Sequence, residues 1–411
     1  MYEKGVVIIG GGHGGSQVAA SLRQEGYDGP LTLLTAEEDI PYQRPPLSKA
    51  FLKEPDHDLL PLRPASFYEK NDIDLRLNAR ATAIDTTGGA VALADGATVP
   101  ADRIVIATGS QPRLPPISGI DLDGVFTLRD AADARAIRER LYASDNVVVV
   151  GGGFIGLEIA GTARLMGKQV TVLEMAGRLM ARAVAPEISS HFLALHQGWG
   201  SDIRLDTAAG SFVGEGGRLT AVTTAGGDTI AADIAIVGTG VAPDTAIAAA
   251  AGIGCNNGIS VDDFAVTDNP AVLAIGDAVS FGHWHTGRRM RLESVQHAVD
   301  QAKVAALAIV GRPKAYREVP WFWSDQGDVK LQMAGLPFGA SESHLRGDPA
   351  SGSFSVFHYD EGRLVAADSV NRAGDHMVAR RLMEAGLSPQ PEAVSDESVN
   401  LRALYKELTS A

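Results

Sequence analysis

The sequence predicts an α/β protein with two similar βαβ units and a mixed α+β segment at its C-terminal end. Short β-branched strands at residues 6–9 and 146–150 each run into a Gly-x-Gly-x-x-Gly turn and then a helical pattern. The chain has 411 residues, too many for one compact core, so two or three domains are expected. Beyond residue 319, strand-like segments precede a helical one.

The first βαβ unit begins with the strand at residues 6–9 and its glycine turn. Gly10 allows the tight turn, Gly12 lets a pyrophosphate approach the backbone, and Gly15 permits close packing of helix on strand. Phosphates then meet the helix N-terminus. A glycine string alone also suits a purely steric turn. The complete βαβ context favours a dinucleotide site.

Acidic residues follow the second strand of this unit, at residues 31–35. Glu37 and Glu38 lie where a carboxylate would accept hydrogen bonds from a ribose diol. The residue just before them is Ala36, which has no carboxylate. Either glutamate therefore remains a candidate for the ribose of the first dinucleotide.

The same motif recurs at Gly151, Gly153 and Gly156, followed by a strand at residues 169–173 and then Glu174. Two dinucleotide sites in one chain are a more specific signal than one. Glu174 is placed to recognise a ribose 2′-hydroxyl, and no arginine follows at once to bind a 2′-phosphate. NADH is therefore expected in preference to NADPH, although a strand-end acid can also be simply solvated.

Two further apolar strands stop at small-residue turns, at residues 102–109 and 271–277. Both are expected to open onto a ligand crevice at the carboxyl edge of a sheet. Asp277 follows a glycine and can bind a ribityl hydroxyl there. A turn aspartate that caps the next segment is the alternative.

Composition and termini narrow the function classes. A net charge of −14 disfavours general binding to nucleic acid or anionic membranes. Residues 1–5 leave no room for a signal sequence before the first strand, so a cytoplasmic protein is expected. No apolar run approaches the ~20 residues of a spanning helix. The histidines, among them His283 and His285, show no metal-ligand spacing, so no metal is expected.

The motifs together resemble the glutathione reductase-like flavoproteins with two Rossmann-like dinucleotide-binding domains. The residues that carry this resemblance are the two glycine turns and residues 107–109, 238–240 and 274–277. Three more segments, residues 41–49, 291–298 and 320–326, resemble oxygenase-coupled, FAD-dependent NADH:ferredoxin reductases of the putidaredoxin reductase type. The resemblance spans essentially the full chain.

This resemblance implies an oxidoreductase that works in electron transfer. Hydride passes from NADH to FAD, and single electrons then pass to a [2Fe-2S] ferredoxin serving a cytochrome P450 or a Rieske-type oxygenase. FAD and NADH are the expected cofactors. A flavin accepts two electrons together and releases them singly.

Cysteine usage separates relatives within this superfamily. Disulfide reductases need a cysteine pair after the first glycine turn, and peroxide-type NADH oxidases need one cysteine near it. Residues 1–254 contain none, and the single Cys255 is expected to be a packing or surface thiol. Flavin is thus the only redox centre expected.

The resemblance also implies three domains. A discontinuous FAD-binding domain comprises residues 1–112 and 245–318, and an inserted NAD-binding domain comprises residues 113–244. A C-terminal α+β domain comprises residues 319–411. Strand-like segments at 330–333, 354–359 and 363–367, with a helical pattern at 375–385, support an antiparallel sheet with helices.

The positions of this chain that match the motifs of the family indicate its site residues. The expected cofactor-binding residues are Gly10, Gly12, Gly14, Gly15, Glu37, Arg44, Lys49, Ala81, Thr108, Gly109, Arg129, Asp277, Glu293, Val295, Gly151, Gly153, Ile155, Gly156, Glu158, Glu174, Gly238 and Gly240. The catalytic residues implied are Lys49, Glu158 and Trp323, with a Lys49–Glu158 ion pair beside flavin N5 and Trp323 near the isoalloxazine. A surface lysine and a favourable acid in the first helical turn are the alternatives for Lys49 and Glu158.

Ferredoxins of such systems are acidic, so docking requires a local positive face on this acidic chain. Arg288, Arg289 and Lys314 form the docking hypothesis, and solvated loop charges are the alternative. Trp321 and Trp323 would shorten an electron path, although two such residues are also ordinary in a strand.

Other functions share the cofactor motifs. A flavin NADH oxidase or a rubredoxin reductase differs only in its acceptor. An NADH-sensing interaction flavoprotein resembling apoptosis-inducing factor would use NADH to switch association. A monomer is expected.

Overall fold

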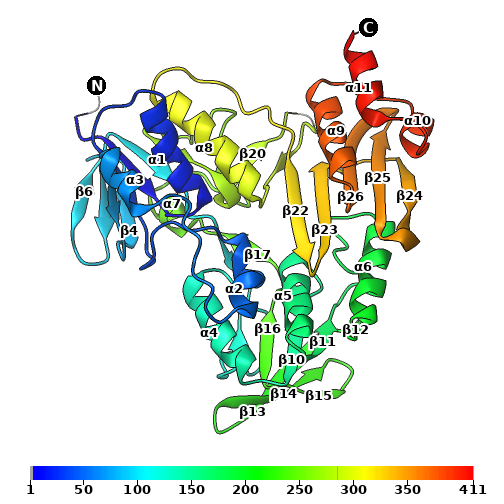
Figure 1. Cartoon of the computed structure of the whole chain (residues 1–411). Helices are drawn as coiled ribbons and strands as arrows, with labels where there is room; N and C mark the ends of the chain where they lie inside the picture. Colours follow the sequence, from blue (N-terminus) through cyan, green and yellow to red (C-terminus); the bar gives the residue numbers. More distant parts are fainter. Residues whose placement is uncertain (1–2, 285, 411) are drawn as a thin grey trace. The chain divides into compact units, whose positions relative to one another are not determined.

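The computed structural model describes residues 3–284 and 286–410, and Figure 1 follows the chain by colour. The chain divides into two compact units. The first comprises Met1–Arg44, Leu59–Gln111 and Val241–Glu318. The second comprises Pro45–Asp58, Pro112–Gly240 and Val319–Ala411. The division into three domains stays a prediction.

The first unit is built on a parallel sheet with strand order β19-β7-β1-β2-β3. Its strands are β1 (Val6–Ile9), β2 (Leu31–Leu34), β3 (Asp74–Arg76), β7 (Arg103–Ile106) and β19 (Val272–Ala274). Val6 pairs with Leu31 on one side and Arg103 on the other. Strands β1 and β2 are buried throughout, which explains why Thr32 is the only polar residue in these two strands.

Helices α1 (His13–Gln24) and α8 (Val295–Ile309) pack against each other in this unit (Figure 1). An antiparallel sheet contains β4 (Ala81–Asp85), β5 (Ala90–Leu93) and β6 (Thr98–Pro100). Shorter elements are α3 (Ala65–Lys70), α7 (Ala246–Ala250), η2 (Gly276–Ala278), β17 (Val241–Pro243), β18 (Ile259–Ser260), β20 (Val279–Gly282) and β21 (Arg289–Met290). Strand β8 (Ser110–Pro112) pairs with β17.

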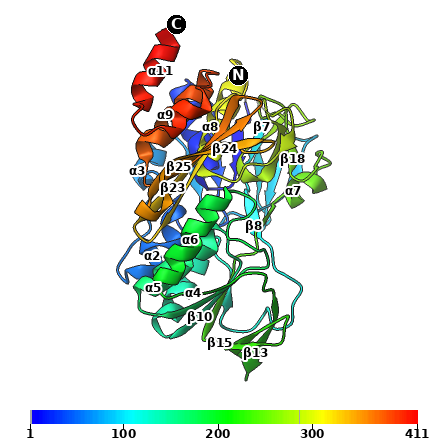
Figure 2. The same ribbon diagram turned by 90° about the vertical axis from the view of Figure 1, so that its right-hand side faces the viewer.

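The second unit contains another parallel sheet, with order β12-β11-β10-β16-β9. Its strands are β9 (Val125–Phe126), β10 (Asn146–Val150), β11 (Gln169–Leu173), β12 (Asp202–Arg204) and β16 (Ile234–Val237). The helices of this part are α4 (Ala131–Tyr142), α5 (Phe154–Leu165) and α6 (Pro186–Gly198). Figure 2 shows an antiparallel sheet of β13 (Ala209–Glu215), β14 (Arg218–Thr224) and β15 (Thr229–Ala231) near β10. Strand β14 of this sheet contacts β16.

The C-terminal part of the second unit is an antiparallel sheet with order β22-β23-β26-β25-β24. Its strands are β22 (Trp321–Gln326), β23 (Val329–Gly335), β24 (Glu342–Asp348), β25 (Ser353–Asp360) and β26 (Arg363–Val370), with η3 (Pro349–Ser351) between β24 and β25. Helix α9 (Ala373–Glu384) packs on β23 and β26 (Figure 1). Helices α10 (Pro391–Ser395) and α11 (Leu401–Ser410) complete this part. The antiparallel sheet and the helix expected from the sequence are present.

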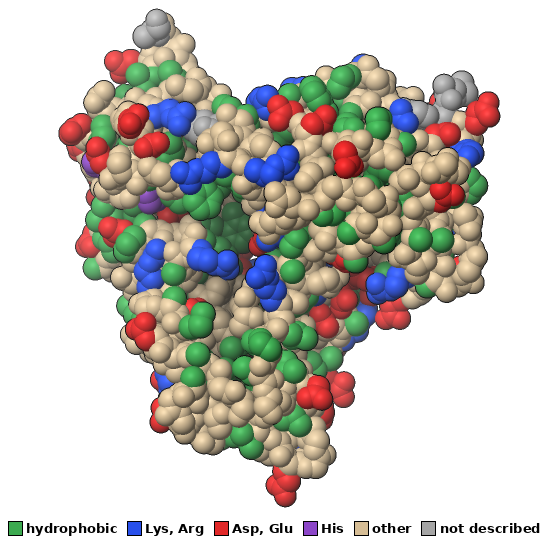
Figure 3. All heavy atoms as spheres, turned by 180° about the vertical axis from the view of Figure 1, so that it is seen from behind, with side chains coloured by type: hydrophobic (Ala, Val, Ile, Leu, Met, Phe, Trp, Pro, Cys, Tyr) green, Lys and Arg blue, Asp and Glu red, His purple; other side chains and the backbone are tan. Residues whose placement is uncertain are grey.

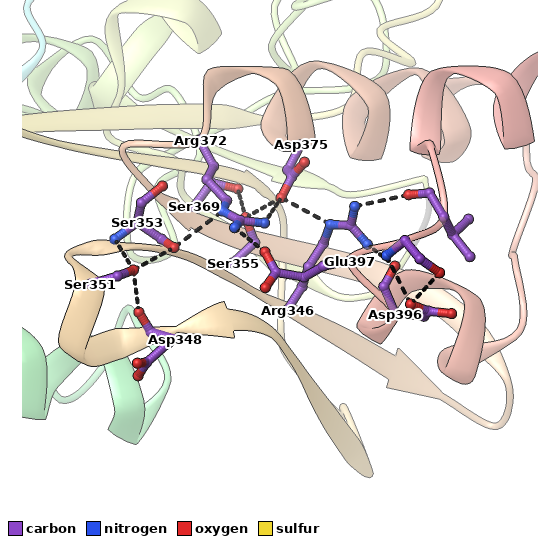
Figure 4. A network of polar contacts seen from close by, with 12 residues as sticks. Arg346, Asp348, Ser351, Ser353, Ser355, Ser369, Arg372, Asp375, Asp396 and Glu397 are labelled. Carbon is purple, nitrogen blue, oxygen red and sulfur yellow. Dashed lines mark hydrogen bonds and ion pairs between the residues drawn. The ribbon is translucent and has the colours of Figure 1, made fainter.

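A polar network joins α10 and the residues that follow it to this sheet (Figure 4). The buried Arg346 guanidinium donates to the carbonyls of Val394, Asp396 and Val399 at 3.1, 2.5 and 2.9 Å. Arg372 pairs with Asp375 at 3.4 Å. These contacts satisfy backbone carbonyls beside α10 that water would otherwise have to solvate.

Residues 45–58 belong to the second unit although their neighbours in sequence belong to the first. They form η1 (Pro45–Ser48) and α2 (Ala50–Lys53), which pack against α4 and α5. The Arg138 guanidinium lies 4.3 Å from the ring centroid of Phe51 and donates to the carbonyl of His57 at 3.1 Å. Lys49, between η1 and α2, is thereby fixed to the part that contains the second glycine turn.

The surface mixes both signs of charge. Figure 3 shows Lys and Arg interspersed with Asp and Glu on one face. Among the described residues, no helix has the length and apolar character needed to cross a membrane.

Candidate functional site

The first glycine turn connects β1 to α1 with very little space around its backbone. Gly10 has φ +115°, and a β-carbon there would lie 2.4 Å from the carbonyl oxygen of Ala107. A β-carbon at Gly15 would lie 1.9 Å from the carbonyl oxygen of Gly10. No other residue can stand at either position without moving the backbone. The steric roles predicted for Gly10 and Gly15 are confirmed.

The two helices that follow the glycine turns have no side-chain cap at their N-termini. Helices α1 and α5 begin after Gly12 and Gly153, and neither N-cap offers a side-chain acceptor. In contrast, Asp130 caps α4 and Ser294 caps α8 through their side chains. The first amide groups of α1 and α5 therefore remain available to a phosphate. This arrangement suits a pyrophosphate at each turn.

Glu37 and Arg44 face each other within the first unit. Arg44 Nη2 lies 2.6 Å from Glu37 Oε1, and the Tyr42 hydroxyl donates to Glu37 Oε2. A β-carbon at Gly12 would lie 3.9 Å from Arg44 Nε. The guanidinium thus stands between the acid and the glycine turn, where it can approach a pyrophosphate. Whether Glu37 or Glu38 binds the ribose stays a prediction.

Other predicted residues follow the carboxyl ends of β7 and β19, which are parallel to β1 and therefore end at the same edge. Thr108 Oγ1 donates to the carbonyl of Asp244 at 2.7 Å, and Gly109 has φ +73°. Ser110 Oγ lies 3.3 Å from Asp277 Oδ2. The structure therefore brings Gly10, Thr108 and Asp277 to one edge of the sheet, as expected for a ligand crevice.

The remaining first-unit candidates lie in different elements. Gly14 is buried in α1, where a β-carbon would lie 3.0 Å from Ile275 Cδ1. Val295 is the first residue of α8, and Glu293 Oε1 accepts from Arg291 Nη2 at 2.7 Å. Ala81 begins β4 and packs against the core of the first unit. Arg129 belongs to the second unit, where its backbone amide donates to Asp133 at 2.8 Å.

The second glycine turn repeats the geometry of the first. Gly151 has φ +109°, and a β-carbon there would lie 2.4 Å from the carbonyl oxygen of Gly238. A β-carbon at Gly156 would lie 2.3 Å from the carbonyl oxygen of Gly151. Gly240 has φ +103°, and the Ile155 side chain is exposed in the first turn of α5. These residues gather at the carboxyl ends of β10 and β16.

Glu174 is fastened to the second turn by backbone hydrogen bonds. Its Oε2 accepts from the amide of Gly152 at 2.7 Å, and its Oε1 accepts from the amide of Ala176 at 2.7 Å. The nearby Arg178 guanidinium donates to the carbonyls of Val184 and Ala181 at 2.8 and 2.5 Å. Glu174, and not Arg178, is therefore the charged group that the turn holds where a ribose diol would be recognised.

The ion pair predicted between Lys49 and Glu158 is present, with Lys49 Nζ 2.6 Å from Glu158 Oε2. Glu158 is buried in α5, where its side chain is only 4% exposed. Ser48 Oγ donates to the same oxygen at 2.5 Å, and Ser324 Oγ donates to Oε1 at 2.7 Å. The carboxylate is thus held by charge and by hydrogen bonds. Its position beside a flavin stays a prediction.

Ser48 and Ser324 are partners of Glu158 that the sequence patterns did not predict. Alternation along β22 places Ser324 on the same face as Phe322 and Gln326. Two polar residues on the buried face of a strand were the available signal. Trp323, on the opposite face, has its ring 5.4 Å from that of Trp321.

Two family profiles match the chain. Residues 4–302 match the profile described as pyridine nucleotide-disulphide oxidoreductase. The chain belongs to this family. Residues 321–405 of this oxidoreductase match a second profile, described as reductase C-terminal. Membership of the pyridine nucleotide-disulphide oxidoreductase family implies a flavin and a nicotinamide nucleotide as cofactors.

This oxidoreductase is similar to known reductases over nearly its full length, in sequence and in structure. Rhodocoxin reductase of Rhodococcus erythropolis is 41% identical over 398 residues, covering 97% of this chain and 93% of the relative. The crystal structure of the ferredoxin reductase for the CYP199A2 system of Rhodopseudomonas palustris is 42% identical, with a TM-score of 0.96 and coverage of 98% and 100%. The putidaredoxin reductase in a covalent complex with putidaredoxin is 35% identical, with a TM-score of 0.95 and coverage of 99% of both chains. These similarities confirm the predicted resemblance to oxygenase-coupled ferredoxin reductases.

The basic residues of the docking hypothesis lie in the first unit of this oxidoreductase. Arg289 Nη1 donates to the carbonyl of Ser280 at 2.5 Å. Within residues 3–284 and 286–410, the exposed side chains of Arg288 and Lys314 have no hydrogen-bond or ion-pair partner. These two charges are therefore the most available of the three.

Metal-ligating side chains do not gather in the described part of the pyridine nucleotide-disulphide oxidoreductase. No group of three or more His, Cys, Asp or Glu residues there is arranged to hold a metal ion. His283 is buried, and His285 lies outside the described residues.

Proposed function

We propose that this protein is an NADH-dependent ferredoxin reductase that supplies electrons to an oxygenase system. It passes electrons to a [2Fe-2S] ferredoxin, which serves a cytochrome P450 or a Rieske-type oxygenase. The observation that carries the proposal is the pair of glycine turns combined with the ion pair between Lys49 and the buried Glu158. The full-length similarity to ferredoxin reductases supports the choice of acceptor.

FAD is proposed as the flavin because the first turn suits a dinucleotide. Gly10, Gly12 and Gly15 leave room for a pyrophosphate against α1, with Arg44 beside it. Glu37 or Glu38 would hold the adenosine ribose, and Asp277 would hold the ribityl chain. FAD would accept two electrons as hydride and release them one at a time.

NADH is proposed at the second turn, where Glu174 would accept hydrogen bonds from the ribose diol. The uncapped N-terminus of α5 would hold its pyrophosphate. Glu158 would approach the nicotinamide and the flavin, and Lys49 would hold its charge in place. Because hydride passes directly between the two cofactors, these residues supply orientation rather than a base.

The larger organisation is proposed from the same assignment. Residues 1–112 and 245–318 would form the FAD-binding domain, residues 113–244 the NAD-binding domain, and residues 319–411 the C-terminal domain with Trp323 near the isoalloxazine.

The protein is expected to be monomeric, which size-exclusion chromatography with light scattering would test. It is expected to work in the cytoplasm, where NADH is supplied, and cell fractionation would test this location.

Anaerobic stopped-flow mixing tests the activity. The flavin absorbance of the purified protein should bleach on mixing with NADH and return on mixing with an oxidised [2Fe-2S] ferredoxin. Bleaching by NADH without transfer to any ferredoxin would overturn the acceptor and favour an oxidase, a rubredoxin reductase or an NADH sensor. Absence of bleaching would overturn the cofactor assignment.

A further inference from the structure

The two carboxylate oxygens of Glu158 are held by different segments of the second unit. Oε2 accepts from Lys49 Nζ at 2.6 Å and from Ser48 Oγ at 2.5 Å. Oε1 accepts from Ser324 Oγ at 2.7 Å. Among the described residues, Ser324 is the only donor to Oε1, and it comes from strand β22 of the C-terminal part.

A chain of buried polar side chains continues behind Ser324. Gln326 Nε2 lies 3.3 Å from Ser324 Oγ. Gln326 Oε1 lies 2.8 Å from Nε2 of His196 in α6. Ser324, Gln326 and His196 are completely buried. This series of side chains therefore runs from His196 in α6, through Gln326 and Ser324 in β22, to Glu158 without contact with solvent.

The donors in this chain all point toward Glu158. The carboxylate can only accept, so the Ser324 hydroxyl donates to it and accepts in turn from the Gln326 amide. The Gln326 carbonyl oxygen then accepts from His196 Nε2–H. Burial lowers the pKa of His196, which favours a neutral ring. The Gln326 carbonyl oxygen beside Nε2 then selects the tautomer with its proton on Nε2. Hydrogen bonds aligned in one direction polarise one another and strengthen the last bond.

We propose that Ser324, supported by Gln326 and His196, is a positioning residue that fixes the orientation of the Glu158 carboxylate for hydride transfer. The inference rests on the proposed function, in which Glu158 approaches the nicotinamide and the flavin. It gives the C-terminal sheet a part in the reductive half-reaction, in addition to any role in electron delivery.

Geometry explains why Ser324 controls orientation rather than charge. Lys49 supplies the positive charge from one side only, through Oε2. Without the Ser324 hydroxyl, Oε1 has no donor within a buried site, and an unpaired buried acceptor is unfavourable. The carboxylate is then free to rotate until both oxygens share Lys49 and Ser48. Such rotation should slow hydride transfer more than it weakens NADH binding.

The test compares Ser324→Ala with Ser324→Thr in the flavin-loaded protein. Anaerobic stopped-flow mixing with increasing NADH gives the limiting rate of flavin reduction and the apparent Kd for NADH. Ser324→Ala should lower the limiting rate by about 10-fold and leave the apparent Kd within about twofold. Ser324→Thr retains the hydroxyl and should recover most of the rate. Gln326→Leu, which removes the next donor, should give a smaller loss of rate.

Ser355→Ala is the matched control. Ser355 is also completely buried in the C-terminal sheet, but it bonds Ser369 and Asp375 at 3.0 and 3.1 Å and does not contact Glu158. Equal slowing in Ser324→Ala and Ser355→Ala would overturn the proposal, because general loosening of the sheet would then explain both. A Ser324→Thr variant as slow as Ser324→Ala would also overturn it.

Glu158→Gln separates this inference from the function on which it rests. A slow Glu158→Gln with a fast Ser324→Ala overturns only the positioning role of Ser324. If flavin is reduced in both variants at the rate of the unaltered protein, the role proposed for Glu158 is wrong, and so is the positioning role of Ser324.

Discussion

Lys49 and Glu158 are 109 residues apart in the sequence, yet Lys49 Nζ lies 2.6 Å from Glu158 Oε2. The two side chains differ in exposure, at 22% for Lys49 and 4% for Glu158. Lys49 also donates to the carbonyl of Pro45 at 3.0 Å. The lysine therefore has water and another acceptor available, whereas the carboxylate depends on its protein donors.

This difference in exposure predicts unequal effects on stability. Lys49→Met leaves a buried carboxylate without its counter-charge and should lower the free energy of unfolding by about 2–3 kcal/mol. Glu158→Gln leaves a lysine that can still reach water and should cost about 1 kcal/mol. Urea unfolding of the flavin-loaded variants, followed by circular dichroism, measures both values.

An exposed ion pair provides the control for this comparison. Arg76 and Asp74 pair at 2.7 Å with side chains 41% and 50% exposed. Arg76→Met should change the free energy of unfolding by less than about 0.5 kcal/mol. A larger loss in Glu158→Gln than in Lys49→Met would contradict the argument from burial.

Glu174 should determine the preference between the two nicotinamide nucleotides. Glu174→Ala removes the proposed acceptor for the ribose diol and should lower kcat/KM for NADH about 30-fold. The value for NADPH should fall less, because its 2′-phosphate gains nothing from a carboxylate. Steady-state kinetics with ferricyanide as acceptor measure both ratios, and Glu187→Ala, at an exposed acid of α6, is the control. A parallel fall for both nucleotides would reject the assignment.

Local patterns were sufficient to predict the glycine turns and the strands around them. Gly10, Gly15, Gly151 and Gly156 each stand where a β-carbon would collide with backbone at 2.4 Å or less. Such positions demand glycine whatever the rest of the chain does. The motif could therefore be interpreted from a dozen residues, and its repetition indicated two sites.

The partners of Glu158 could not be predicted in this way. Ser48 and Ser324 reach it across 110 and 166 residues, and serine is common in turns and on surfaces. The packing of residues 45–58 with the second unit likewise depends on long-range contacts such as that of Arg138 with Phe51. A single sequence contains no local signal for such contacts.

His297 should make the stability of the protein sensitive to acid. Burial, with a smaller contribution from His283, lowers the pKa of His297 from 6.5 to about 3. Between these values the unfolded chain binds a proton that the folded protein does not, so stability is complete above pH 6.5 and falls as the pH decreases. From pH 6.5 to about pH 5 the loss should be about 2 kcal/mol. His297→Gln should lose about 2 kcal/mol less over this range, by urea unfolding at each pH.

A second histidine variant shows whether this effect is specific. His344 is partly exposed on β24 and pairs with Glu342 at 3.1 Å. His344→Gln should retain the acid sensitivity of the unaltered protein. An unchanged pH dependence in His297→Gln would instead show that other groups cause the loss.

Arg288 and Lys314 should govern association with the ferredoxin rather than reduction by NADH. Both side chains are exposed, and within the described residues neither has an ion-pair partner. By contrast, Arg312 and Arg317 nearby pair with Glu25 and Asp263 at 2.5 and 2.6 Å. Exposed charges of this kind act mainly on the rate of association with a partner of opposite charge.

Reversing both charges, with Arg288→Glu and Lys314→Glu together, should raise KM for a [2Fe-2S] ferredoxin about 10-fold at low salt. The rate with NADH and ferricyanide should stay within about twofold, because neither residue belongs to the proposed cofactor sites. The difference in KM should shrink at high ionic strength, where screening shortens the range of the interaction. A control with Arg218→Glu and Arg402→Glu reverses two exposed charges on β14 and α11 of the second unit and changes the net charge by the same amount. If this control raises KM as much as the first double variant, then overall charge directs the ferredoxin and the docking face lies elsewhere.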